Sequence, residues 1–446
     1  MDNLEKWIDY ALQHGADEAE LFYEHSESNT IKVYQQQVES LLSATAKGIG
    51  IRVFVNQGMG FAYTSDFTPD SLQNVILEAI ENAKICPSDQ YNGLPEVQSF
   101  EPITDIFDPT YADVTTDEKI QWLLTMEKQA SEYHPNITKV VQASFADQLT
   151  EIRLLNSKGF DGSFKSNYCY GSVYVAAEKD QEMQTGGGVT FGRHLHELRA
   201  TEAVADACES ALVLLGGKKV QSQKAPVVFD KKVGIMFMYI LSNSLNAEAV
   251  QKGRSLFKDK IGQTVAHADV SIVDDGRYTK GLATSPFDGE GIPSGTTQLI
   301  ENGVLQGLVY DTYTARKEGV DSTGNASRSY RSTPSLSTTN FYMKNGSHTK
   351  EEIIGSVENG FYVMEVSGLV TGGANPITGD FSVGATGRWI ENGQFTSAVR
   401  EVTIAGNLIS MLTDIELIGN DMEIIPIVGS FGSPTFKVKQ LAISGK

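Results

Sequence analysis

Four Asn-Gly pairs in the second half of the chain constrain its fold more than any other local feature. They stand at 302–303, 345–346, 359–360 and 392–393. Both residues of an Asn-Gly pair adopt positive φ at low cost, which the type I′ turn of a two-residue β-hairpin requires. Two of the pairs share the sequence Ile-Glu-Asn-Gly, which we interpret as the same turn chemistry arising twice rather than as a duplicated domain. The region after about residue 225 is therefore predicted to be rich in strands.

The first half of the chain alternates between helical and strand periodicities. Apolar residues at helical spacing predict helices over about 4–12, 69–85, 117–133 and 198–215. The second of these begins at Thr68-Pro69 and ends before Cys86-Pro87. Period-two alternation predicts an α-β-β-β-β-α layer over roughly 1–85, with its strands at 19–23, 31–33 and 49–55. Similar strands recur at about 140–190, with a turn at 156–159.

These patterns predict an α+β protein with two domains. Residues 1–220 are expected to form an N-terminal domain of α/β layers with antiparallel strands. Residues 221–446 are expected to form a strand-rich domain with hairpins and a mixed or barrel-like sheet, and with a helix at about 231–245. A length of 446 residues and a hydrophobic fraction of 40% are ample for two large cores.

The net charge and the number of cysteines limit which partners the protein can bind and in which compartment it is expected. The net charge of −20, without any run of Lys and Arg, disfavours binding to nucleic acid or to anionic lipid. The first residues lack the apolar stretch of a signal peptide, and no apolar run is long enough to span a bilayer. Cys86, Cys169 and Cys208 are too few and too scattered for a disulfide framework. We expect a cytoplasmic protein that binds neither nucleic acid nor membrane.

No common catalytic pattern is complete in the sequence. The chain has no Gly-x-Ser-x-Gly elbow, no Walker loop and no complete GxGxxG. The stretch His194-Leu-His196-Glu197 begins like a zinc-binding HExxH helix, but Ala200 stands where the second His is required. Two His at this spacing could share a strand face and bind a metal. No third ligand is apparent, so we favour a solvated strand end or helix start.

Acidic residues between glycines and prolines form a second group of candidates. Asp288 and Glu290 lie in Pro286–Pro293, and Asp380 lies in Gly379–Gly384. A pair of carboxylates in a rigid loop acts as acid and base, or holds a hard cation, in many sites. Asp and Gly are equally common as plain turn formers. The residues alone favour turn chemistry over a site.

Several stretches, taken in order along the chain, resemble the TldD/PmbA family. The resemblance covers nearly the whole sequence and rests on the order and spacing of the stretches rather than on any single one. They are Gly48–Val55, Gly60–Thr64, Ser285–Gly291, Ile300–Gly303, Tyr310–Arg316, Ser322–Asn325, Thr378–Gly384, Val402–Asn407 and Gly432–Val438.

The resemblance implies a two-subunit zinc metalloprotease. In this family the TldD-type subunit carries an HExxxH helix whose two His bind zinc together with a Cys nearer the C-terminus, and whose Glu acts as general base. The PmbA (TldE) type subunit lacks that set and pairs with the first. The resemblance implies that the complex cuts unfolded peptides and matures or degrades small proteins. An older description, modulator of DNA gyrase, also attaches to the family.

This chain departs from the catalytic pattern at every element. On the helix after Pro226–Phe229, Met238 and Asn243 stand near the two His positions, and Tyr239 stands near the Glu. Met and Asn are poor zinc ligands, and no cysteine follows Cys208. The resemblance is therefore to the PmbA/TldE branch, with no catalytic residue and no metal ligand in this chain and with zinc expected in a TldD-type partner.

The retained loops point to a binding role. We expect a peptide cleft lined by three loops, which would hold unfolded peptides beside exposed edge strands. The expected lining residues are Asp288, Glu290, Gly291, Gly372, Gly373, Asn375 and Asp380. The expected assembly is a pair with a TldD-type subunit, or a homodimer. Two alternatives stay open: a stand-alone hydrolase that uses Asp288, Glu290 or Asp380, and a regulatory binding protein of the gyrase-modulator kind without proteolysis.

Overall fold

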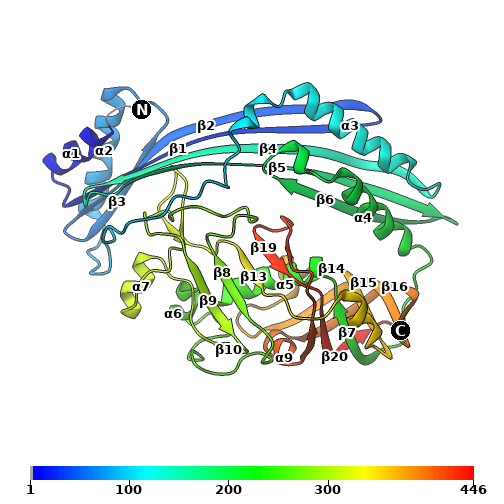
Figure 1. Ribbon diagram of the computed structural model, residues 1–446. Coiled ribbons are helices and arrows are strands. Elements are labelled where there is room, and N and C mark those ends of the chain that lie inside the picture. The colour runs from blue at the N-terminus through cyan, green and yellow to red at the C-terminus, as the bar shows by residue number, and fades with distance from the viewer. Residues whose placement is uncertain (1–3) are drawn as a thin grey trace.

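Six long antiparallel strands form one sheet in the N-terminal half of the computed structural model, which describes residues 4–446. The strand order is β3-β2-β1-β4-β5-β6, with β1 and β4 paired at the centre. Figure 1 shows that these strands arch as one curved layer over the C-terminal half. The strands are β1 (Glu18–Tyr34), β2 (Gln37–Val55), β3 (Gly58–Thr64), β4 (Ile137–Asn156), β5 (Asp161–Lys179) and β6 (Glu182–Gly192).

The N-terminal half contains the same order of elements twice. Each set of three strands is flanked by two helices, so that α-β-β-β-α recurs, and the two sets meet through β1 and β4. The four predicted helices are confirmed to within two residues at each end. They are α1 (Glu5–Gln13), α2 (Pro69–Ile85), α3 (Thr116–Glu132) and α4 (Ala200–Val213).

The predicted α-β-β-β-β-α layer is wrong by one strand. Residues 19–23 and 31–33 belong to the single strand β1. The polar stretch between them stays extended because its backbone pairs with β2 on one side and with β4 on the other. The predicted turn at 156–159 is confirmed between β4 and β5.

All four helices cover one face of the sheet, and the other face rests on the C-terminal half. On β1, Leu21 and Tyr23 pack beneath α1 and α2, and Ile31 and Val33 pack in the core beneath α3 and α4. Phe22 points to the opposite face, where its cluster includes Phe287 and Tyr330 from the second half of the chain. The period-two alternation therefore separates a helix-covered face from an interdomain face.

Close backbone approach explains two of the glycines. A Cβ on Gly188 in β6 would lie 1.8 Å from the carbonyl oxygen of Ala203 in α4, so this helix packs on the strand only because the side chain is missing. A Cβ on Gly48 would lie 2.1 Å from the Tyr330 ring. Gly48, which begins the first of the family-like stretches, therefore serves the contact between the two halves.

A closed five-stranded barrel occupies the C-terminal half. Its strands follow the order β16-β15-β14-β7-β20, and β20 pairs back with β16 over Thr403–Ala405. The prediction of an α+β fold with a barrel-like C-terminal region is confirmed. The strands are β7 (Gln223–Phe229), β14 (Asn359–Ser367), β15 (Asp380–Glu391), β16 (Gln394–Asn407) and β20 (Phe436–Ser444), with β17 (Ile415–Ile418) continuing beside β20.

A second sheet packs beside the barrel, and helix α5 (Lys231–Ser244) contacts both. The helix lies against β13 and β19 of this sheet and against β14 of the barrel, which confirms the predicted helix at about 231–245. Its side chains Ile235, Phe237 and Met238 belong to the largest core of the molecule. The sheet contains β8 (Ile272–Asp275), β9 (Thr296–Glu301), β10 (Val304–Leu305), β13 (Phe341–Met343), β18 (Glu423–Ile424) and β19 (Phe431–Ser433).

Short elements complete the described chain. None of its helices combines the length and the apolar character needed to cross a bilayer. The short elements are η1 (Pro109–Asp113), η2 (Leu195–Glu197), α6 (Ala247–Gln251), α7 (Thr312–Glu318), β11 (Ala326–Ser327), β12 (Ser335–Leu336), α8 (Lys350–Gly355), η3 (Leu369–Gly373) and α9 (Leu408–Thr413).

Two of the four Asn-Gly pairs form the predicted hairpin turns. Asn302-Gly303 and Asn392-Gly393 have positive φ at both residues and connect β9 to β10 and β15 to β16. Asn359-Gly360 instead opens β14, where its backbone pairs with β15, and 345–346 lies in a loop. Three further two-residue turns with positive φ at both residues escaped prediction because they lack glycine. These are Gln35-Gln36, Asn56-Gln57 and Asp180-Gln181.

Candidate functional site

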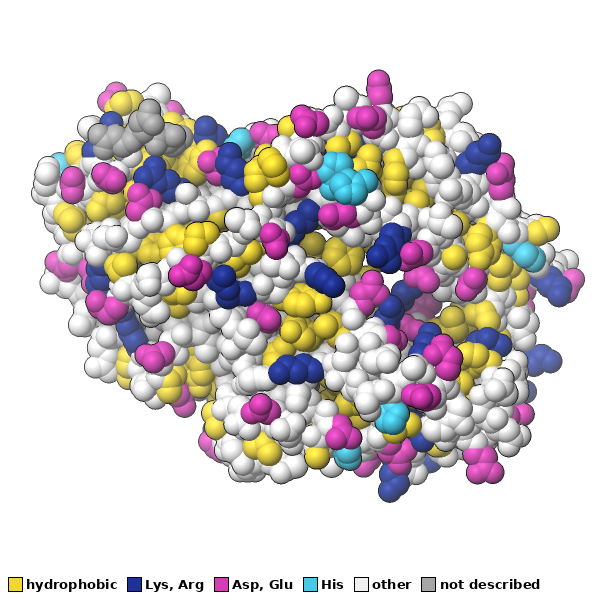
Figure 2. Space-filling view, viewed as in Figure 1, with side chains coloured by type: hydrophobic (Ala, Val, Ile, Leu, Met, Phe, Trp, Pro, Cys, Tyr) yellow, Lys and Arg dark blue, Asp and Glu magenta, His cyan; other side chains and the backbone are white. Residues whose placement is uncertain are grey.

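A cleft of about 1160 Å³ separates the N-terminal sheet from the C-terminal half. One wall is formed by the end of β6 and by α4, and the other by the start of α5, by the loop 278–282 and by residues 421–425. Figure 2 looks onto this side of the molecule, where basic and acidic side chains gather around the hollow between the two halves. The size of the cleft is in the range of sites that bind small molecules or short peptide segments.

The start of α5 brings three polar side chains together at the cleft. Asp230 caps the helix by accepting a hydrogen bond from the Lys232 backbone N–H at 3.0 Å. Its other oxygen accepts hydrogen bonds from the Tyr362 hydroxyl and from Lys350 Nζ, the latter at 3.2 Å. Burial works to raise the pKa of Asp230, but the charge of Lys350 and the hydrogen bonds outweigh burial and hold the pKa below its ordinary value. Asp230 is therefore ionised at neutral pH.

Charged contacts cross the cleft and fix its two walls. Lys232 at the start of α5 pairs with Asp206 of α4 at 3.0 Å. Arg193, just after β6, donates to the carbonyl oxygens of Thr279 and Gly281 at 3.3 and 2.9 Å. These contacts tie the two walls of the cleft to each other.

Arg388 gives the cleft a cationic group without an acidic partner. Its guanidinium lies 4.3 Å from the centre of the Phe395 ring, and both residues line the cleft. Within residues 4–446, no carboxylate lies within ion-pair distance of it. Partial burial lowers the pKa of Arg388, yet a guanidinium remains protonated in proteins. The cleft thus offers a positive charge on an apolar ring to whatever enters it.

The three α5 residues that we expected near the positions of the zinc ligands and the general base have different surroundings in the structure. Met238 is buried in the core at 1% exposure. Tyr239 packs edge to face on Phe431, with ring centres 5.5 Å apart. Asn243 is exposed, and its amide donates to the Tyr239 carbonyl oxygen at 3.0 Å. These side chains do not converge and do not suit zinc.

No alternative metal cluster replaces them within residues 4–446. In that range no three His, Cys, Asp or Glu side chains are grouped as metal ligands would be. The ring centres of His194 and His196 lie 4.0 Å apart with the planes tilted by 42°, and His194 Nδ1 accepts the His196 backbone N–H. Glu197 accepts the Arg193 backbone N–H at 2.7 Å. The HExxH-like stretch is thus the start of a short 3₁₀ turn, as the sequence favoured.

The Asp288 loop is buried at the contact between the two halves and does not line the cleft. Asp288 accepts three backbone N–H groups, from Glu290, Ile292 and Ala326, at 2.8, 2.9 and 2.9 Å. Burial, together with the charge of Glu290, raises the pKa of Asp288. Gly291 has a φ of +83°, which closes the turn. The bonds from Glu290 and Ile292 are those of a turn within the loop, and the bond from Ala326 joins the loop to a strand 38 residues away.

Glu290 belongs to a buried ionic cluster that joins the two halves. Its carboxylate pairs with Arg52 of β2 at 3.0 Å and accepts the Thr312 backbone N–H at 2.9 Å. Arg52 also pairs with Glu20 of β1 at 2.7 Å, and Glu20 pairs with Arg328 from the C-terminal half. All four ionic side chains are at most 6% exposed. Burial works to raise the pKa of Glu290, but the charge of Arg52 and the hydrogen bonds from Thr312 and Arg52 outweigh burial and hold the pKa below its ordinary value.

The loop at 369–380 lies elsewhere, at the C-terminal end of α5. Ser244, the last residue of the helix, donates to the Pro376 carbonyl oxygen at 2.9 Å. Gly372 has a φ of +111°, and the Gly373 backbone N–H donates to the Gly368 carbonyl oxygen. Asn375 accepts the Ile377 backbone N–H at 2.8 Å.

Asp380, at the end of this loop, is exposed and accepts the Asn407 amide at 3.0 Å. Among the described residues, no hydrogen bond or ion pair joins this loop to the Asp288 loop.

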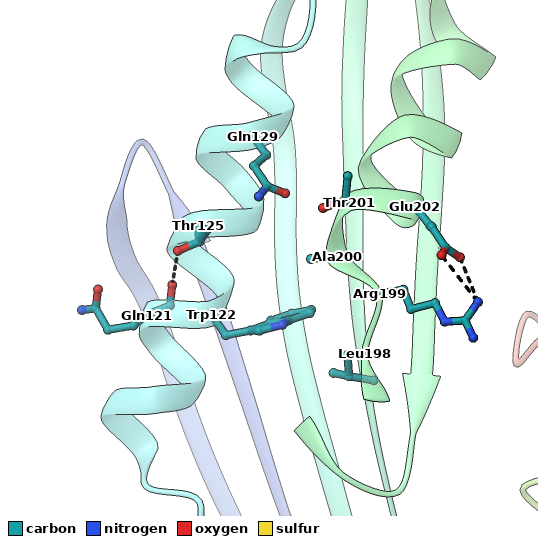
Figure 3. Close-up of a pocket in the computed structure, with 9 residues that line it drawn as sticks. All are labelled: Gln121, Trp122, Thr125, Gln129, Leu198, Arg199, Ala200, Thr201 and Glu202. Atoms are coloured by element: carbon teal, nitrogen blue, oxygen red, sulfur yellow. Dashed lines mark hydrogen bonds and ion pairs between the residues drawn. The ribbon is translucent and has the colours of Figure 1, made fainter. Parts of the chain in front are cut away.

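A smaller hollow of about 580 Å³ lies on the helix-covered face, between α3 and the start of α4. Figure 3 shows Trp122 extending from α3 toward Leu198, with Arg199 and Glu202 paired at its edge. The ring is seated on Gly171 of β5, where a Cβ would lie 2.3 Å from it. Among the described residues that line this hollow, the charged ones, Arg199 and Glu202, are both exposed, so we take the interdomain cleft as the candidate site.

Sequence reasoning missed the residues of the interdomain cleft. Asp230, Lys350 and Tyr362 come from three distant segments that only the barrel brings together. Asp230 between a strand and a helix was a usable signal, because Asp is a preferred N-cap residue. Arg388 could not be predicted, because nothing in the sequence around a single Arg in a strand indicates what it will contact.

Comparison with known proteins gives a consistent result along the chain. Three family models match, described as PmbA/TldA metallopeptidase domain 1 (residues 19–83), central domain (109–215) and C-terminal domain (222–445). A protein described as metalloprotease PmbA from Escherichia coli O157:H7 is 29% identical, over 94% of this chain and 92% of its own length. A protein described as a metalloprotease TldD homologue from Haemophilus influenzae is 25% identical, over 98% and 95%.

Solved structures show the same fold. TldE from Thermococcus kodakarensis superposes with a TM-score of 0.89 at 23% identity, over 99% of this chain and 100% of that one. A protein from Thermotoga maritima, described as a candidate modulator of a DNA gyrase, superposes with a TM-score of 0.91 at 24% identity, over 99% of both chains. Because the family models span most of the sequence, the chain belongs to the PmbA/TldD family of metallopeptidase-like proteins.

Proposed function

We propose that this chain is a non-catalytic PmbA/TldE-type subunit of a TldD/TldE-type zinc metalloprotease that processes or degrades unfolded peptides and small proteins. Membership of a metallopeptidase family supports a peptidase-related role. The finer assignment rests on helix α5. On this helix Met238 and Tyr239 pack against other side chains, and Asn243 forms a hydrogen bond within the helix. Zinc and the general base would therefore come from a TldD-type partner.

The interdomain cleft is where we place the client peptide. The outer edge of β6 borders the cleft, and among the described strands β6 pairs only with β5. An extended peptide can therefore add to this edge through backbone hydrogen bonds, which selects unfolded segments without selecting a sequence. Arg388 would contact acidic or C-terminal carboxylate groups of the client. This chain's part is to bind and orient; it moves no proton and holds no metal.

The compartment proposed for this complex is the cytoplasm. The three cysteines are unpaired, with Cys86 exposed and Cys169 and Cys208 buried. Free thiols are the ordinary state in a reducing environment.

Reconstitution of peptidase activity tests the proposal. An unfolded peptide is incubated with this chain, with a TldD-type subunit, and with both, each with and without a chelator. The proposal expects chelator-sensitive cleavage only in the mixture. A TldD-type subunit that is fully active alone, or cleavage by this chain alone, would contradict it.

A charge reversal in the cleft tests where the client binds. Arg388→Glu in the mixture is expected to raise KM for an acidic peptide by about tenfold with little change in kcat, because one charge-assisted contact is lost. Lys128→Glu is the matched control, since Lys128 lies on α3 and is 62% exposed. Equal kinetics for the two variants would place the client outside the cleft while leaving the subunit role intact.

A further inference from the structure

The fold holds Arg388 firmly in place and gives its guanidinium no acceptor. Arg388 lies in the middle of β15, directly opposite Tyr362 of β14 and Ala398 of β16, so its backbone is fixed from both sides. The guanidinium is half-buried over the Phe395 ring. Within residues 4–446, no hydrogen bond or ion pair uses its N–H groups. Leaving these N–H groups away from water without an acceptor costs free energy, which a bound anion would recover.

The other cations of the cleft differ from Arg388 in having partners. Arg193 donates to four backbone carbonyl oxygens of the surrounding segments. Among the described residues that line the cleft, Lys280 and Arg388 are the only cations without such partners, and Lys280 is exposed. Arg388 is therefore the cation of the cleft that is both half-buried and free to bind a ligand. The cations that pair with a carboxylate are Lys231, Lys232, Lys350 and Arg199.

The surface beside Arg388 is apolar. Met364 and Phe395 both line the cleft and pack against the same small core, which includes Tyr362. The Tyr362 and Phe395 rings meet edge to face, with ring centres 5.1 Å apart. The Tyr362 hydroxyl is already used, because it donates to Asp230. A ligand that suits this place therefore combines an anionic group with apolar surface.

The charge of the cleft favours a ligand with a single negative group. More acidic than basic side chains line the cleft, and the whole chain has a net charge of −20. A segment rich in carboxylates or phosphates is therefore repelled. Every peptide carries one carboxylate at its C-terminus whatever its sequence, and the fork of a guanidinium matches a carboxylate. A free C-terminus that ends in an apolar residue has both properties.

The same cleft offers a backbone edge to the segment that precedes this C-terminus. Residues 189–192 at the end of β6 line the cleft. Among the described residues, β5 is the only strand that pairs with β6, and no other backbone hydrogen bond occupies the outer edge of β6. Strand addition combined with capture of the terminal carboxylate is an established way for a protein to bind a peptide. The carboxylate would fix the position of a strand that backbone hydrogen bonds alone leave free to slide.

We propose that the interdomain cleft binds the free C-terminal end of a client peptide, with the terminal carboxylate on Arg388 and an apolar last side chain on Met364 and Phe395. This inference rests on the proposed function and adds the class of client to it. Clients are selected by their chain end rather than by acidic side chains. Arg388 is a binding residue and takes no part in the cleavage step.

Two peptides that differ only at the C-terminus test the proposal. The probe is Gly-Ser-Gly-Ser-Val-Ser-Val-Leu, labelled at its N-terminus with an uncharged fluorophore and made as the free acid and as the amide. Binding to the full-length chain is measured by fluorescence anisotropy. The free acid is expected to bind about tenfold more tightly than the amide, because the amide cannot form the charge-assisted contact.

Variants of Arg388 assign this preference to one side chain. Arg388→Gln should bind both peptides as weakly as the wild-type chain binds the amide, whereas a folding defect would weaken binding of the amide as well. Arg388→Lys keeps the charge but loses the fork, so part of the preference should remain. Arg254→Gln is the matched control, since Arg254 is exposed and does not line the cleft, and it should keep the full preference.

Four results would overturn the proposal. The first is a wild-type chain that binds neither peptide, and the second is one that binds both equally. The third is a preference for the free acid that survives in Arg388→Gln. The fourth is an amidated probe with one internal Glu that binds as tightly as the free acid, which would assign Arg388 to acidic side chains. The subunit role is tested separately by chelator-sensitive cleavage in the mixture, so the two failures are distinguishable.

Discussion

Removing one charge from the buried ionic cluster should destabilise the protein far more than removing one from its surface. Glu20 is fully buried and pairs with Arg52 at 2.7 Å and with Arg328. Glu20→Gln keeps the shape but leaves two buried arginines facing Glu290 alone. An uncompensated buried charge costs about 3–5 kcal/mol. We expect a loss of that size in the free energy of unfolding.

The matched control is an ion pair on the same sheet. Glu151 pairs with Lys165 at 3.5 Å, and the two side chains are 38% and 50% exposed. Glu151→Gln should cost less than about 1 kcal/mol, because solvent screens an exposed pair. Both variants are compared by urea unfolding followed by the fluorescence of the three tryptophans.

A double substitution separates charge from packing. Glu20→Met with Arg328→Met removes one anion and one cation and leaves the Arg52–Glu290 pair intact at 3.0 Å. Replacing a buried pair by apolar groups is often neutral. The double variant should therefore be more stable than Glu20→Gln. The reasoning is refuted if Glu20→Gln costs no more than Glu151→Gln, or if the double variant is the less stable of the two.

Three further substitutions, one of them with a matched control, test the backbone and the cleft. Gly188→Ala places a methyl group 1.8 Å from the Ala203 carbonyl oxygen and should cost at least about 2 kcal/mol in thermal unfolding, whereas Gly295→Ala, with open space around its Cβ, should cost under about 1 kcal/mol. Gln181→Gly, at a φ of +68° in the β5–β6 turn, should stabilise by up to about 1 kcal/mol, and a loss would show that the side chain has a role in the turn. The folded-state pKa of Asp230 is below its unfolded value, so its stabilisation is present above about pH 4 and is lost as pH falls through the folded pKa. Urea unfolding from pH 7 down to pH 2 should therefore show a weaker acid dependence for Asp230→Asn than for wild type, and equal slopes would contradict this.

Local sequence patterns predicted the helices and the type of fold because these depend on near neighbours. Thr68-Pro69 and Cys86-Pro87 set the ends of α2, since capping and proline geometry act within one turn. Hairpins at Asn302 and Asn392 followed from turn chemistry. The turn at Gln35-Gln36 did not, because α3 holds it through Glu127, 91 residues away.

The candidate site was less predictable because its residues meet only in the folded chain. The sequence pointed to Asp288 and Glu290 as loop carboxylates, but it could not show that Arg52, 238 residues from Glu290, pairs with Glu290. Nor could it show the cleft, whose walls come from β6 and α4 on one side and from α5 and 421–425 on the other. Hydrophobic periodicity and motif spacing describe near neighbours in the sequence, so they cannot predict which distant residues come into contact.

The measurement that tests the central claim most directly is the zinc content of the purified chain, alone and co-expressed with a TldD-type subunit, by mass spectrometry alongside peptide cleavage. The account predicts that stoichiometric zinc and cleavage appear together only in the mixed complex, because the proposal assigns zinc and the general base to the TldD-type subunit, and Met238, Tyr239 and Asn243 of α5 serve packing and a helix-internal hydrogen bond. Stoichiometric zinc with cleavage by this chain alone would contradict it.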